Sequence, residues 1–194
     1  SAAMRNFVGI DLGVEGVPDE TTICKFRHLL ERNKLGKVLL TAVNDHLHRS
    51  GIKITKGTIV DATIIGAPSS TKNQDGQRDP EMHQTAKGQQ WYFGMKAHVG
   101  VDSRTKLVHT VLASAANVAD REALPYLLHG NETRVWGDQG YQGQTAVIHA
   151  RAPNAKDFTN RGYRYHGRIN EVEKAKNRNK SRVRAKVEHV FGVI

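Results

Sequence analysis

Three acidic residues stand at positions where acidic side chains are unusual. Asp61 lies in the middle of an apolar, strand-like run from Ile59 to Ile65. Asp138 directly follows a second apolar run, and Glu188 lies on a basic, helical stretch. Aspartate is disfavoured in strands, and a buried carboxylate costs free energy unless it is paired or binds a metal. The three positions therefore suggest a metal site.

Carboxylates that are brought together repel one another, which raises their pKa values. A divalent cation removes that conflict, and a purely oxygen ligand set suits Mg²⁺, or Mn²⁺, better than zinc. Two such ions about 3.5–4 Å apart can activate the attacking oxygen and stabilise the leaving oxygen of a phosphodiester displacement. The alternative is that the three acids are unrelated and that each forms its own salt bridge.

The charge of the chain indicates a polyanionic partner, most simply nucleic acid. The 194 residues include 29 Lys and Arg against 19 Asp and Glu, a net charge of +10. Between Arg161 and Lys186 the chain carries a net charge of +8. Such a run is often only a solvated helix face, but here it leads to Glu188. The candidate DNA contacts are Lys87, Lys96, His98, Arg178, Lys180, Arg182 and Arg184.

Several classes of protein are disfavoured. Cys24 is the only cysteine, so no intrachain disulfide can form. The sequence contains no apolar run of membrane-spanning length, and residues 1–5 do not resemble a signal peptide. We therefore expect a cytoplasmic protein located where the DNA is. Neither a zinc-hydrolase HExxH pattern nor a phosphate-binding glycine loop is present, so zinc hydrolysis and ATP use are not indicated.

The pattern of apolar residues predicts an N-terminal helical segment, residues 1–51, and an α/β domain, residues 52–194. The segment contains two helices joined by a turn at 33–36, which either pack as a pair or form a DNA-reading helix-turn-helix. The domain is predicted to contain strands at 58–65, 91–101, 106–113, 133–137 and 157–159, and helices at 120–128, 146–151 and from 170 onward. Residues 66–90 read as a long polar loop.

These elements place the three acids at one region of a sheet. Asp138 ends the fourth strand, where Gly137 and Gly140 are expected to let the chain turn sharply. Glu188 borders an apolar stripe on the last helix, and Arg184 lies one turn before it. The stripe consists of Val183, Val187, Val190, Phe191 and Ile194.

Two other acids have simpler explanations. Asp102 is expected to be a turn residue of the hairpin between the second and third strands. Asp120 precedes a helix, and capping of that helix accounts for it adequately; a role in the site is the alternative.

The order of elements, with the three acids on the first strand, the fourth strand and the last helix, resembles the ribonuclease-H-like core of DDE transposases. Several segments also resemble bacterial insertion-sequence transposases of the insertion-sequence-five branch. These segments are 18–31 (PDETTICKFRHLLE), 87–102 (KGQQWYFGMKAHVGVD), 113–120 (ASAANVAD), 136–143 (WGDQGYQG) and 184–192 (RAKVEHVFG).

The resemblance implies a ribonuclease-H-like mixed sheet flanked by helices, with Asp61, Asp138 and Glu188 as catalytic, metal-binding residues. It further implies Mg²⁺-dependent cleavage at transposon ends, attack of the freed 3′-hydroxyl on target DNA, double-stranded DNA as partner and a homodimer of the full-length form. Arg184 matches a signature of the family, in which it would orient Glu188 or contact phosphate. Ser181 stands where that signature has tyrosine, and its lysine would fall at position 195.

We therefore expect a DDE catalytic core that is truncated at its C-terminus. Two alternatives remain open: a non-catalytic, DNA-binding remnant of a transposase, and a general ribonuclease-H-like nuclease.

Overall fold

The computed structural model describes residues 6, 9, 11, 13–14, 16–52, 54–68, 71 and 76–192. The chain divides into two compact units, Ser1–His46 and Leu47–Ile194. In the first unit, Asp19 begins helix α2 (Glu20–Arg32) by accepting a hydrogen bond from the Thr22 amide at 2.7 Å. Helix α3 (Gly36–Arg49) follows, and the division between the units falls in its last turn. Both predicted helices are thus present, but neither of these fully described helices buries a residue.

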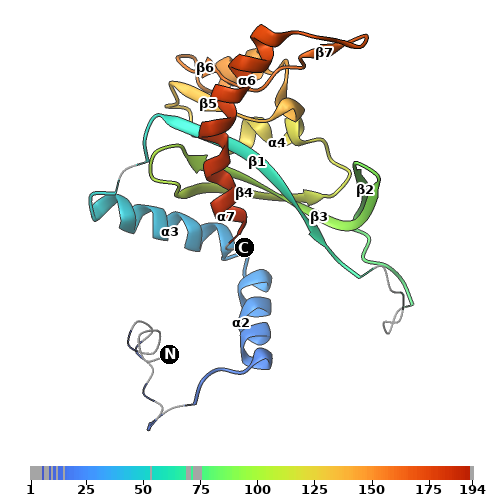
Figure 1. Ribbon diagram of the computed structural model, residues 1–194. Coiled ribbons are helices and arrows are strands. Elements are labelled where there is room, and N and C mark those ends of the chain that lie inside the picture. The colour runs from blue at the N-terminus through green and yellow to red at the C-terminus, as the bar shows by residue number, and fades with distance from the viewer. Residues whose placement is uncertain are drawn as a thin grey trace. The chain divides into compact units, whose positions relative to one another are not determined.

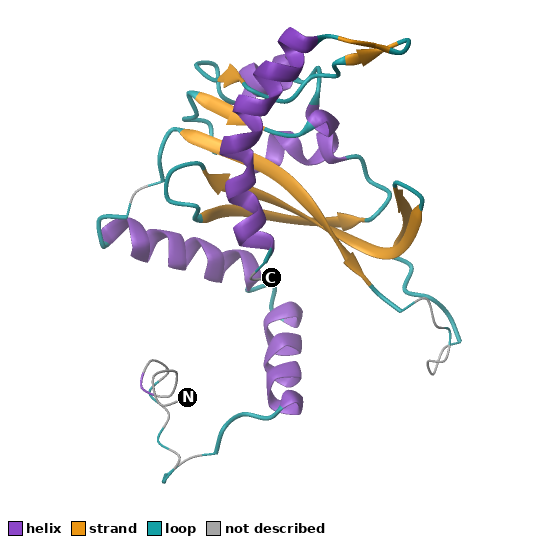
Figure 2. Cartoon of the chain, in the orientation of Figure 1, coloured by secondary structure: helices purple, strands orange, loops and turns teal. Residues whose placement is uncertain are grey.

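The second unit is built on one six-stranded sheet with the order β2-β3-β1-β5-β6, in which β4 also pairs with β3. Strands β1 to β4 pair in antiparallel fashion, whereas β1, β5 and β6 run parallel. Figure 2 shows the strands of this sheet in orange. The strands are β1 (Gly57–Gly66), β2 (His83–Lys87), β3 (Gln90–Asp102), β4 (Val108–Ala115), β5 (Arg134–Trp136) and β6 (Lys156–Asp157).

Helices cover both faces of the sheet, because alternate strand residues point to opposite sides. Val60 packs with residues of α4 (Asp120–Leu127), α5 (Thr145–Arg151) and the short helix η1 (Gln139–Tyr141). Its neighbour Ile59 packs on the other side with residues of α6 (Glu171–Arg184), η2 (Ala185–Val187) and α7 (Glu188–Phe191). In Figure 1 the red helix α6 crosses the sheet near β1. The predicted mixed α/β, ribonuclease-H-like architecture is confirmed.

The prediction was wrong at three places. The polar loop at 66–90 contains β2, which pairs with the start of β3 but whose sequence HQTAK offers no apolar face to recognise. A second, two-stranded sheet, β7 (Arg164–Tyr165) with β8 (Arg168–Ile169), precedes α6. The single helix expected from 170 onward is interrupted by η2, whose last residue, Val187, is fully buried in the core.

A buried polar cluster lies where β1 begins. Glu132 is 1% exposed and accepts hydrogen bonds from the Thr58 hydroxyl and from the amides of His129 and Gly130. His109 Nε2 lies 3.3 Å from the same hydroxyl. Burial, followed by the nearby His129, lowers the pKa of His109 from its ordinary 6.5 to about 4. His109 is therefore held neutral in the folded chain.

This cluster predicts a loss of stability in mild acid. Between pH 6.5 and 4 the unfolded chain binds a proton at His109 that the folded chain does not, so the free energy of unfolding falls as pH drops. The contribution of His109 over this window is on the order of 3 kcal/mol. Urea unfolding across it should show a smaller pH dependence for His109→Gln than for the wild type. The matched change at exposed His149 should leave the dependence unaltered; equal slopes for all three proteins would contradict the prediction.

Candidate active site

One pocket of about 500 Å³ is lined by all three predicted acids, Asp61, Asp138 and Glu188. Asp61 comes from the middle of β1, Asp138 from the turn between β5 and η1, and Glu188 from the start of α7. The pocket is also lined by Asp120 and by the cationic residues Lys87, Lys96 and Arg184. Elements that are far apart in the sequence thus bring four carboxylates and three cations to one place.

The side chain of Asp61 is largely buried, with 13% of it exposed. Burial raises its pKa against the opposing effects of the Ala62 amide and of Arg184, and the charges of Asp138 and Asp120 raise it further. Its Oδ2 accepts a hydrogen bond from Arg184 Nη1 at 2.8 Å. Arg184 was expected to orient Glu188 or contact phosphate, whereas its partner in this structure is Asp61.

Asp138 is positioned by a tight turn. Its Oδ1 accepts a hydrogen bond from the Gly140 amide at 2.8 Å and so caps η1. A Cβ atom on Gly137 would lie 2.9 Å from Tyr141 Cδ2 and 3.1 Å from Val60 Cγ2. Gly137 does not have a positive φ, so the predicted reason for a glycine here, a sharp backbone turn, was wrong. A glycine fits because any side chain at this position would crowd Tyr141 and Val60.

Glu188 is exposed and follows the buried Val187. Val187, together with the partly buried Val183, Val190 and Phe191, packs on the core cluster that contains Ile59. The predicted apolar stripe is therefore confirmed for these residues, and Ile194 lies outside the described residues. This packing places Glu188 at the border of the stripe and at the pocket.

Asp120 is a residue whose position the sequence did not reveal. The N-cap of α4 is Ala119, which makes no side-chain capping bond, so the prediction of Asp120 as a cap was wrong. Its Oδ1 instead accepts a hydrogen bond from Lys96 Nζ at 2.9 Å. An acid near a helix N-terminus is so common that its sequence context carried no signal. By contrast, Asp102 is a turn residue as predicted, since it accepts hydrogen bonds from the Arg104 and Thr105 amides.

Two of the candidate DNA contacts point into the protein. His98 is fully buried, with Nε2 2.8 Å from the Ser114 hydroxyl, so it offers no surface to DNA. Lys180 donates to the Thr159 carbonyl at 2.9 Å and its side chain is only 16% exposed. The structure therefore gives the His98 side chain no access to DNA and engages Lys180 in an internal contact, as it does Lys96, whose side chain is 15% exposed. Lys87, Lys96 and Arg184 line the pocket, and Arg178 and Arg182 are exposed on α6.

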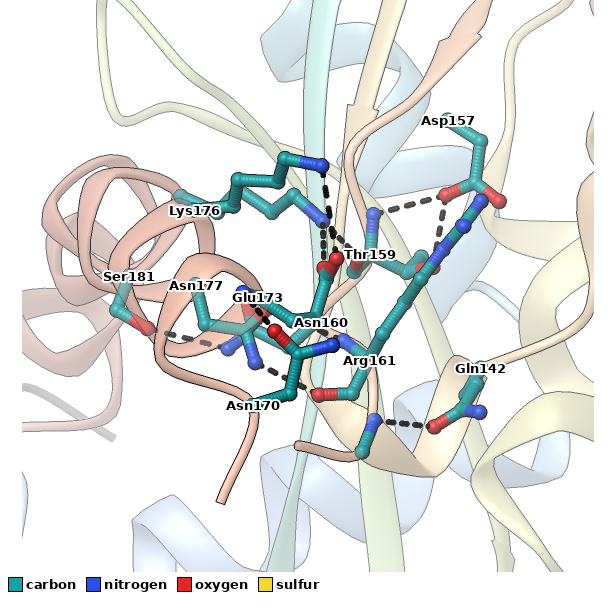
Figure 3. Close-up of polar contacts among 12 residues, drawn as sticks. Gln142, Asp157, Thr159, Asn160, Arg161, Asn170, Glu173, Lys176, Asn177 and Ser181 are labelled. Carbon is teal, nitrogen blue, oxygen red and sulfur yellow. Dashed lines mark hydrogen bonds and ion pairs between the residues drawn. The ribbon is translucent and has the colours of Figure 1, made fainter. Parts of the chain in front are cut away.

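Helix α6 is fastened to the segment that follows β6 by a polar network (Figure 3). Asn177, which is 8% exposed, accepts a hydrogen bond from the Arg161 amide at 3.1 Å and donates one to the Arg161 carbonyl at 2.6 Å. Asn160 donates to the Ser181 hydroxyl at 3.1 Å, and its own amide donates to the Gly137 carbonyl at 3.0 Å. Because Gly137 precedes Asp138, the network links the second acid to the helix that leads to the third.

The donor set fits a divalent cation by its chemistry. The acids are oxygen donors, and the pKa of Asp61 is raised mainly by burial and to a smaller degree by the charges of Asp138 and Asp120. The Tyr141 hydroxyl is fully buried without a hydrogen-bond partner, and its pKa is raised by burial and then by Asp120, Asp61 and Asp138. Across the described part of the chain, however, no three His, Cys, Asp or Glu side chains already stand together as the ligands of one ion.

Comparison with known protein families gives a match over most of the chain. Residues 53–194 match the family described as the transposase DDE domain, and this stretch contains all four carboxylates of the pocket. No solved structure matches the chain. Within the described ranges, no helix is both long enough and apolar enough to cross a membrane.

The polar network predicts a specific loss of stability in Asn177→Ala. The substitution leaves the Arg161 amide and carbonyl without their partners, which costs about 1–3 kcal/mol of unfolding free energy. Asn179→Ala, an exposed position on the same helix, should change stability by less than about 0.5 kcal/mol. Chemical denaturation of both variants measures the difference, and equal stabilities would exclude this role for Asn177.

Asp61→Asn should stabilise the metal-free protein at neutral pH. The pKa of Asp61 is raised above 3.8, so the folded chain loses stability as pH rises through that raised pKa, and at pH 7 it carries the whole penalty. The uncharged amide removes the penalty and should raise the melting temperature in EDTA, with a difference that shrinks toward pH 4. The exposed Asp79→Asn serves as control. A lower melting temperature for Asp61→Asn at pH 7 would mean that the ion pair with Arg184 outweighs the cost of burial.

Proposed function

Because the chain belongs to the family of transposase DDE domains, we propose that it is the catalytic core of an insertion-sequence transposase of the insertion-sequence-five branch. In this proposal the protein cleaves DNA at the ends of the element and joins the freed 3′-hydroxyl to target DNA. The observation that carries the proposal is the convergence of Asp61, Asp138 and Glu188 on one pocket of about 500 Å³.

The three acids have distinct roles in the proposed site. Asp61 and Asp138 would hold the cations, and Glu188, which is the most exposed of the three and stands on a separate helix, would complete the set. Two Mg²⁺ or Mn²⁺ ions, when bound, supply the positive charge that favours the attacking and leaving oxygens of the displacement. In their absence Arg184 neutralises Asp61 through the hydrogen bond at 2.8 Å.

Double-stranded DNA, as transposon end and as target, is the proposed partner. Lys87 is exposed at the pocket, where its ammonium group can contact a phosphate. Arg178 and Arg182 are exposed and lie one turn apart on α6, so they present two charges on one side of the helix. Phosphate contacts of this kind do not depend on the base sequence of the DNA. A homodimer of the full-length form and a location in the bacterial cytoplasm, on the nucleoid, belong to the same proposal.

The proposal is tested by Mg²⁺-dependent nicking of a duplex that carries the inverted repeats flanking the gene. Asp61→Ala, Asp138→Ala and Glu188→Ala should each reduce the nicking rate by roughly 10²–10⁴-fold, because each removes several kcal/mol of transition-state stabilisation. Glu171→Ala, which removes an exposed carboxylate from α6 outside this pocket, should leave the rate unchanged.

The outcomes also separate the alternatives. Nicking that persists in Asp61→Ala would show that the three acids are not the catalytic set. A wild type that cuts unrelated duplexes as fast as the repeats would be a general nuclease. A wild type that binds the repeats but never nicks them with Mg²⁺ or Mn²⁺ would be a DNA-binding remnant. The observation that favours the remnant is the ion pair between Arg184 and Asp61, which engages one of the three acids.

A further inference from the structure

Asp120 shares the pocket of the three acids but is held differently. Its Oδ1 accepts a hydrogen bond from Lys96 Nζ at 2.9 Å, and the same ammonium group donates to the Val118 carbonyl at 2.9 Å. The Lys96 and Asp120 side chains are 15% and 27% exposed. Lys96 thus fixes the orientation of the Asp120 carboxylate by binding one of its two oxygens.

The second oxygen of Asp120 and one oxygen of Asp138 both lie near Gly140. A Cβ atom on Gly140 would stand 3.0 Å from Asp138 Oδ1 and 3.5 Å from Asp120 Oδ2. The two carboxylate oxygens therefore border the same glycine from two elements, the turn after β5 and the start of α4. A cation bound near this glycine could take an oxygen from each of the two carboxylates.

Two fully buried polar groups near Asp120 have no hydrogen-bond partner. His98 Nδ1 is unpartnered and lies 4.0 Å from Asp120 Oδ1. The Tyr141 hydroxyl is unpartnered as well, and among the charges that raise its pKa, after burial itself, Asp120 is the largest, ahead of Asp61 and Asp138. Unpartnered buried polar groups are rare in folded proteins. Their presence near Asp120 is a second observation, independent of the acids themselves, that points to a ligand at this site.

We propose that Asp120 is a fourth acidic residue of the site and that its Oδ2 binds a divalent cation together with Asp138. Lys96 and the Val118 carbonyl hold Asp120 in the orientation that this requires. The inference rests on the proposed function, because it adds a ligand to the same site. A purely structural ion pair between Lys96 and Asp120 is the competing explanation.

Mn²⁺ binding to the whole chain, followed by the electron paramagnetic resonance signal of the unbound ion, tests the proposal without any reaction. Asp120→Asn keeps an oxygen that can accept from Lys96 but loses the charge. It should weaken Mn²⁺ binding about tenfold or more, in the range found when residues around a metal are replaced. Glu122→Gln, an exposed change on the same helix, is the matched control and should bind Mn²⁺ like the wild type.

Lys96→Met separates a ligand from a structural partner. This variant breaks the same ion pair but keeps the Asp120 carboxylate. If Asp120 binds the cation, Lys96→Met should weaken Mn²⁺ binding less than Asp120→Asn does, because the carboxylate ligand remains although its orientation is no longer fixed. If the pair is only structural, both variants should weaken Mn²⁺ binding alike, and the proposal is then wrong.

The failure of this inference differs from a failure of the proposed function. If Asp61→Asn loses Mn²⁺ binding whereas Asp120→Asn binds like the wild type, Asp120 is not a ligand but the three-acid site stands. If the wild type itself binds no Mn²⁺, both proposals fail together.

Discussion

Repulsion among carboxylates in a half-buried pocket is the constraint on which the site depends. Asp61, Asp120, Asp138 and Glu188 line one pocket, and each added negative charge disfavours the ionised form of its neighbours. In the folded chain two basic side chains compensate part of this negative charge. Arg184 forms an ion pair with Asp61, and Lys96 forms one with Asp120, both within 2.9 Å. The first ion pair joins β1 to α6 and the second joins β3 to α4. The two pairs therefore also help to hold these elements together.

The scaffold must keep these charges close in spite of their repulsion. Strand β1 buries Val60 on one face and Ile59 on the other, so helices pack on both sides and Asp61 cannot move independently of the core. Asn177 and Asn160 fasten α6 to the segment after β6, and Val187 anchors the following turn. Gly137 leaves room for Tyr141 directly beside Asp138. Packing of the core thus keeps the carboxylates close together although they repel one another.

The basic segment before Glu188 divides into two functional parts. Lys180, Arg184 and Lys186 make internal contacts, with the Thr159 carbonyl, Asp61 and the Ser103 carbonyl respectively. Arg178 and Arg182 remain exposed. Part of the charge of this segment therefore holds the C-terminal helices to the rest of the domain, and only the remaining part is available for the proposed contact with DNA.

The sequence by itself determined the element types, because apolar periodicity is a local property. The grouping of Asp61, Asp138 and Glu188 was expected from the resemblance of the sequence to DDE transposases. The sequence did not reveal β2, whose polar residues carry no such pattern, nor the interruption of the last helix at η2. Only the tertiary structure decided which partner each charged side chain takes: Arg184 binds Asp61 rather than Glu188, His98 is buried, and Asp120 faces the pocket instead of capping α4. Charge pairs between distant residues depend on distances of a few ångströms, and those are set by the packing of the whole domain rather than by any local run of residues.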